Sequence, residues 1–169
     1  EAKYEFLRLL RTPEFALPSL LFPCLFYVLF GVLLNKSNGD AARYLKAYEK
    51  AVDAIGATAK RGTVFEQPSI SVKLSALHPR YEEKTANSCL PELYDMVLAL
   101  AIRAKSHNAG FTIDAEEVAR LDISLELFSQ LAAAPELKGW DGLGLAVQAY
   151  GRRAKPALQY LAEVAERAG

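Results

Sequence analysis

The chain has 169 residues, with 20 Lys and Arg against 20 Asp and Glu, so its formal net charge is zero. Because 51% of the residues are hydrophobic, the composition predicts one ordinary folded domain and excludes a disordered tail. No long run of Lys or Arg is present, which argues against nucleic acid as a partner, since phosphate backbones are held by clustered cations.

The N-terminal region contains a long apolar stretch. Residues 15–34 carry no charged side chain and could cross a bilayer core of roughly 30 Å as a helix rising about 1.5 Å per residue. Basic residues lie mostly before the stretch, which places the N-terminus on the cytoplasmic side. A membrane span, a buried helix interrupted by Pro18 and Pro23, and a secretory signal stay open as interpretations. We expect a location in the cytoplasm or at the cytoplasmic side of a membrane.

The same region resembles a known membrane helix. The segment RLLRTPEFALPSLLFPCLFYVLFGVLLN, within residues 5–38, is similar to the first membrane helix of type-2 ABC exporter permeases, through its basic entry and its PEFALPSLLFP stretch. We therefore divide the chain into an apolar helical segment, residues 1–38, and an α/β domain, residues 39–169.

The second part alternates between helical and strand patterns. A turn at residues 37–40 is followed by apolar residues at three- and four-residue spacing over 41–60, which predicts an amphipathic helix capped by Asp40. Short apolar strands separated by helices then predict right-handed βαβ units with a parallel sheet, and hence an α/β fold. The expected strands cover residues 69–74, 111–114 and 143–148, and the expected helices 91–106, 116–133 and 155–168.

Each predicted strand ends in a polar residue: Lys73, Asp114 or Gln148. In a parallel sheet these ends meet at the carboxyl edge, where ligands bind. Each residue alone has a structural explanation, because Lys73 could reach solvent, Asp114 could cap a helix from Ala115, and Gln148 could bond to loop backbone. Their recurrence at equivalent positions favours a shared site.

Three sequence blocks carry a second resemblance. SISVKLSALHPRYE, IDAEEVARLDISLELF and LGLAVQAYGRRA resemble the proline dehydrogenase domain of the bifunctional proline-utilisation flavoenzymes, over residues 41–169. The resemblance implies a distorted (βα)8 barrel that binds FAD at its carboxyl face and oxidises L-proline to pyrroline-5-carboxylate. It also implies roles for four residues: Lys73 beside the substrate carboxylate, Asp114 as the active-site acid, Ala115 touching FAD through its backbone, and Gln148 hydrogen-bonding the flavin.

The chain is short for such a barrel. A complete (βα)8 barrel needs roughly 200 to 250 residues, whereas about 100 follow Ser69, enough for three βα units of a partial barrel. We therefore expect little or no activity from this chain alone. We also expect self-association through open strand edges and an apolar inner sheet face. Two alternatives stay open: a membrane-anchored, non-enzymatic protein whose apolar helix is the functional part, and a generic α/β binding module.

Single residues outside these motifs receive structural interpretations. We expect His78 to order the loop after the first strand, His107 to lie at the surface, and Glu117 to oppose a helix dipole. Cys24 and Cys89 lack any metal-binding spacing, so we expect free thiols and no metal site.

Overall fold

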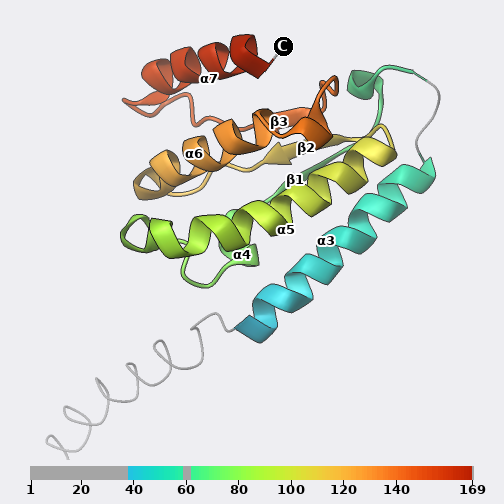
Figure 1. Ribbon diagram of the computed structural model, residues 1–169, viewed down its shortest axis with the longest axis horizontal. Helices are drawn as coiled ribbons and strands as arrows, with labels where there is room; N and C mark the ends of the chain where they lie inside the picture. The colour runs from blue at the N-terminus through green and yellow to red at the C-terminus, as the bar shows by residue number, and fades with distance from the viewer. Residues whose placement is uncertain (1–37, 59–61, 169) are drawn as a thin grey trace, which may run out of the picture. The chain divides into compact units, whose positions relative to one another are not determined.

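The computed structural model describes residues 38–58 and 62–168, which form an α/β unit around one parallel sheet (Figure 1). The apolar stretch 15–34 lies outside the described residues, as do nearly all of residues 5–38 and the predicted N-terminal segment. The two-part division of the chain therefore stays a prediction. Within the two described ranges, no helix combines the length and the apolar character that a membrane span requires.

The sheet consists of three parallel strands in the order β1-β2-β3: Ser69–Val72, Gly110–Ile113 and Leu143–Leu145. Val72 pairs with Ile113, and Ile113 pairs with Leu145, so the three carboxyl ends are in register. The predicted fold class, α/β with about three parallel strands and flanking helices, is confirmed. Each strand ends before the polar residue that was expected to close it.

The long helices lie side by side in the order of the chain: α3 packs beside α5, α5 beside α6, and α6 beside α7 (Figure 1). Single-turn 3-10 helices connect several of these elements, at Val64–Glu66, Glu83–Thr85, Val118–Arg120 and Pro135–Leu137. The α-helices are α3 Asn38–Thr58, α4 Leu74–Leu77, α5 Ala86–Ser106, α6 Leu121–Ala132 and α7 Ala154–Ala168.

Three helices begin elsewhere than expected. Helix α3 starts at Asn38, so Asp40 lies within its first turn and does not cap it from outside. Helix α5 starts at Ala86 instead of Pro91, and Pro91 lies inside it, because the extra turn buries Cys89 beside Leu93 in the core. Tertiary burial here outweighs the cost of a proline within a helix. Helix α6 starts at Leu121 instead of residue 116, since Glu117 has extended backbone angles and a 3-10 turn follows it.

The two faces of the sheet differ in polarity because strand side chains alternate. Ile70, Val72, Phe111 and Ile113 are all buried in the core that the helices cover. The alternate positions of β1 are serines, both exposed, and Thr112 on β2 is half-buried. The expectation of an apolar inner face is therefore wrong: small and polar residues occupy it.

Candidate functional site

Lys73 and Asp114 meet at the carboxyl edge of the sheet. Lys73 directly follows β1 and Asp114 directly follows β2, and the Lys73 Nζ lies 3.3 Å from Asp114 Oδ2. The side chains are 60% and 34% exposed, respectively. An ion pair this open contributes only about 0 to 1 kcal/mol to stability. The pair therefore contributes little to the stability of the fold.

Backbone hydrogen bonds hold both residues. The Asp114 N–H donates to the Val72 carbonyl at 2.9 Å, which continues the sheet ladder past the end of β2. The Lys73 N–H donates to the Tyr48 hydroxyl of α3 at 3.1 Å. Asp114 Oδ1 accepts from the Ala115 N–H at 3.0 Å. Asp114 therefore orders its own loop, whereas the helix it was expected to cap begins only at Leu121.

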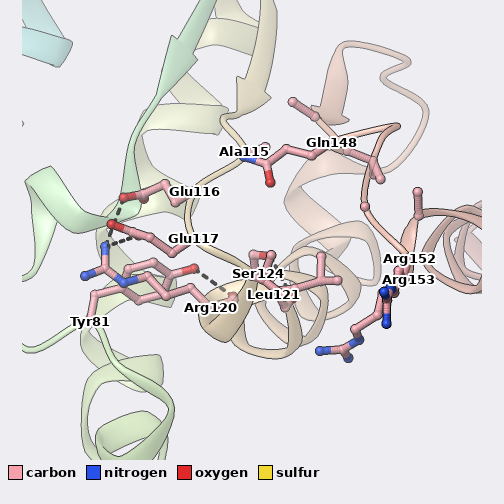
Figure 2. A pocket seen from close by; sticks show the side chains of 15 residues that line it. Tyr81, Ala115, Glu116, Glu117, Arg120, Leu121, Ser124, Gln148, Arg152 and Arg153 are labelled. Atoms are coloured by element: carbon pink, nitrogen blue, oxygen red, sulfur yellow. Dashed lines mark hydrogen bonds and ion pairs between the residues drawn. The ribbon is translucent and has the colours of Figure 1, made fainter.

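Ala115 and Gln148 line a pocket of about 390 Å³ between the loops after β2 and β3 and the starts of α6 and α7. Figure 2 shows the Gln148 amide directed toward Ala115. Much of the lining is apolar and includes Val118 and Leu121. Lys73 and Asp114 are not part of this lining. The four predicted site residues thus form two groups, joined through the Asp114–Ala115 peptide bond.

A cluster around Glu116 was missed by the sequence analysis. The Glu116 side chain is only 9% exposed, and its Oε1 accepts from the Ser75 N–H at 2.9 Å. Its Oε2 accepts from Arg120 Nη1 at 3.1 Å. Glu117 contacts the same guanidinium at 3.0 Å, but its side chain is 70% exposed (Figure 2). The two neighbouring glutamates therefore have different surroundings, which no periodicity in the sequence signals.

Arg120 also packs on Tyr81. The guanidinium carbon lies 5.3 Å from the centre of the Tyr81 ring, within the range of a cation–π contact. The Tyr81 side chain is 2% exposed, and its hydroxyl donates a long hydrogen bond of 3.4 Å to the Arg120 carbonyl. Burial, and then the charge of Glu116, raise the pKa of Tyr81 well above its ordinary value. The phenol is therefore neutral at physiological pH and serves packing rather than proton transfer.

At the other side of the pocket, Arg153 forms an ion pair with Asp122 of α6. Its hydrogen bond with Asp122 raises the pKa of Arg153 further. Arg152 lines the same pocket, whereas Tyr150 lies in the loop between β3 and α7 and is 84% exposed. The lining of the pocket thus combines three arginines, Arg120, Arg152 and Arg153, with the two glutamates.

His78 is buried and hydrogen-bonded within the segment that follows β1. Its side chain is buried, and its Nδ1 accepts from the Arg80 N–H at 3.2 Å. Nε2 therefore carries the proton and donates to Glu92 Oε2 at 3.1 Å. This network orders the loop after β1, as the sequence analysis expected.

The other single residues lie away from the sheet edge. His107 ends α5, half-buried, with Nε2 3.5 Å from Asp53 Oδ1. Cys89 is a buried free thiol whose pKa burial raises, and Cys24 lies outside the described residues. Over the described ranges, no group of His, Cys, Asp and Glu side chains could hold a metal ion.

The chain is similar to proline dehydrogenases. The family model for proline dehydrogenase matches residues 29–169. The bifunctional protein PutA of Escherichia coli (strain K12) is 42% identical over 128 residues, which cover 76% of this chain and 10% of that protein. PutA of Rhizobium meliloti is 45% identical over 130 residues, or 77% of this chain and 10% of that protein. The chain thus spans about a tenth of the length of these curated relatives.

Solved structures agree with the fold. A crystal structure of a variant of Bradyrhizobium japonicum Proline Utilization A (PutA) superposes with a TM-score of 0.76 at 45% identity, covering 78% of this chain and 14% of that chain. PutA from Bdellovibrio bacteriovorus, at 22% identity and a TM-score of 0.71, shares the fold. None of these matches supports the permease resemblance of residues 5–38, and the family match begins inside the apolar stretch, before the predicted start at residue 41.

Proposed function

Because the chain belongs to the proline dehydrogenase family, we propose that it carries part of a site that oxidises L-proline to pyrroline-5-carboxylate with FAD as cofactor. The observation that carries this proposal is the Lys73–Asp114 pair at 3.3 Å, which the peptide bond after Asp114 connects to Ala115 in the pocket that Gln148 also lines. The roles of these four residues come from the family resemblance, and the geometry is compatible with them.

On the substrate side, the Lys73 ammonium suits the carboxylate of proline, because the two carry opposite charges. Its side chain is 60% exposed and free to meet a ligand from the open face of the sheet. Asp114 lies within ion-pair distance of Lys73, at 3.3 Å, and holds its ammonium at the sheet edge. Bound proline would share this cation with Asp114.

On the cofactor side, the pocket lined by Ala115 and Gln148 fits part of a flavin. Its volume of about 390 Å³ falls within the roughly 300 to 1,000 Å³ typical of small-molecule sites. Bound FAD would supply the acceptor for the hydride that proline loses. The Gln148 amide can donate to a flavin carbonyl, and Ala115 can contact the ring through its backbone without adding charge.

The site is partial, so we propose that the chain alone has little or no turnover. Only three strands are present among the described residues, whereas the family barrel has about eight. The later strands would supply further contacts to FAD and proline.

We keep a cytoplasmic location as part of the proposal. The alternative of a membrane-anchored, non-enzymatic protein has no support from the relatives, and the helix it needs lies outside the described residues. Fractionation without detergent tests the location, because a membrane-anchored chain would enter the pellet.

The test is a visible absorption spectrum of the purified chain, recorded after adding FAD and desalting, and again after adding proline. Retained flavin bands that proline bleaches only slowly would support the proposal. A colourless protein would contradict its flavin part, and rapid repeated turnover would contradict the expected low activity. Gln148→Ala should weaken flavin retention, whereas Asp114→Asn should retain flavin and slow the bleaching. Gln130→Ala is the matched control for Gln148→Ala, because this exposed glutamine of α6 lies outside the lining of the pocket.

A further inference from the structure

Two loops meet at the carboxyl edge of the sheet. The β1 loop, residues 73–78, carries Lys73 and contains the single turn of α4, and the β2 loop, residues 114–117, carries Asp114. Besides the exposed Lys73–Asp114 pair, a second bond joins these loops, from the Ser75 N–H to Glu116 Oε1 at 2.9 Å. Ser75 follows Lys73 at the same spacing at which Glu116 follows Asp114. The two bonds therefore close a small ring of backbone at the site.

The two bonds differ in strength. The Lys73–Asp114 pair is open to water, which screens it. Glu116 is 9% exposed, and a carboxylate so buried is costly unless charge and hydrogen bonds compensate it. Arg120 and the Ser75 N–H supply both. The buried bond is thus the firmer of the two.

We propose that Glu116 is a positioning residue that holds the β1 loop against the β2 loop and so sets the separation of Lys73 from Asp114. The inference rests on the proposed function, since Lys73 and Asp114 matter as its substrate-side residues. Glu116 reaches these residues only through the backbone. The Tyr48 hydroxyl, which accepts from the Lys73 N–H at 3.1 Å, holds the same residue from α3.

Acylation of Lys73 in the full chain, followed by mass spectrometry, tests this inference. An amine held in an ion pair is shielded from the reagent, and Lys155, exposed on α7, is the internal reference. Glu116→Ala and Asp114→Asn should each raise the Lys73 rate by about two- to five-fold, the factor that matches the energy of an exposed ion pair. Glu116→Gln should restore the slow rate, because its amide oxygen can still accept from Ser75.

Glu117→Ala is the matched control and should leave the Lys73 rate unchanged, since it removes a carboxylate from the same Arg120. A Lys73 rate that responds to Asp114→Asn but not to Glu116→Ala would overturn the inference. Loss of hydrogen-exchange protection at the buried Phe111 in Glu116→Gln would also overturn it, because the role would then be general stability. Neither measurement needs FAD or proline, so a failure of the proposed function does not affect this test.

Discussion

At the scale of single residues, the burial of a carboxylate determines how strongly its ion pairs and hydrogen bonds hold the structure. Glu116 and Glu117 are neighbours in the sequence and contact the same guanidinium of Arg120. Glu116 is 9% exposed and also accepts from the backbone of Ser75, whereas Glu117 is 70% exposed. Solvent competes for the second contact and not for the first. The same residue type therefore has a structural and positioning role at one position and little role at the next.

This difference predicts unequal losses of stability. Glu116→Ala should lower the free energy of unfolding by about 1.5 to 3 kcal/mol, because it removes hydrogen bonds to a buried charged group. Glu117→Ala should change it by less than about 1 kcal/mol, as for an exposed ion pair. Urea denaturation followed by circular dichroism measures both. Equal losses for the two variants would contradict the assigned burial.

The ion pair of Asp53 with Arg103 should make the stability of the folded chain depend on pH in the acidic range. Hydrogen bonding from Arg103, with Nε and Nη2 at 2.5 and 2.7 Å, holds the pKa of the Asp53 carboxyl below its usual value of 3.8. A depressed pKa means that the pair contributes stability above the unfolded-state pKa and loses it as the pH falls through the folded-state pKa. Asp53→Asn should therefore lose less stability than the unchanged chain on acidification below about pH 4. Urea midpoints compared at neutral and acidic pH check this, and parallel losses in both proteins would contradict it.

At the scale of elements, the contact between α3 and α5 depends on one small residue. A Cβ on Gly56 of α3 would overlap the ring of His107 at the end of α5, so the two helices approach closely at this point. His107 in turn lies 3.5 Å from Asp53. Glycine is unfavourable inside a helix, so the close approach explains its presence here.

The close approach predicts a coupling between two substitutions. Gly56→Ala alone should destabilise the chain by about 1 to 3 kcal/mol, through overpacking against His107. In a His107→Ala background the same change should stabilise by about 0.5 to 1 kcal/mol, because alanine favours the helix and the obstructing ring is gone. A double-mutant cycle from urea denaturation measures the coupling. Additive effects would show that the two residues do not interact.

At the scale of the whole described unit, β1 and β3 are the two edge strands of the sheet, and neither has a further strand partner among the described residues (Figure 1). Helix α3 packs near β1, and small or polar residues occupy the face of the sheet opposite the helices. Any self-association would therefore use strand edges more than apolar burial, because the exposed serines of β1 offer little apolar surface.

We predict concentration-dependent self-association through these edges, weakened little by high salt because backbone hydrogen bonds carry no net charge. Sedimentation equilibrium at increasing concentrations, with and without added salt, measures it. A monomer at every concentration would contradict the prediction. Association abolished by salt would point to the charged surface instead.

The sequence alone predicted the α/β class, the three strands and the proximity of Lys73 to Asp114. Apolar runs mark buried strands, and parallel strands in register place the residues that follow them side by side. It did not predict the extra turn of α5 before Pro91 or the late start of α6. Sequence patterns predict a helix wherever apolar residues recur at helical spacing. The start of α5 depends instead on the burial of Cys89, and the start of α6 on the extended backbone at Glu117.

Only the tertiary structure distinguished Glu116 from Glu117. In the sequence both look like carboxylates at the start of a helix. The partner that separates them is the backbone N–H of Ser75, which lies in α4 after β1 and reaches Glu116 only once β1 and β2 have paired. Contacts between residues that are distant in the chain produce no periodic pattern in the sequence. Sequence patterns could therefore place Lys73 and Asp114 at one edge of the sheet, but they could not identify Glu116 as the residue that holds the two loops together.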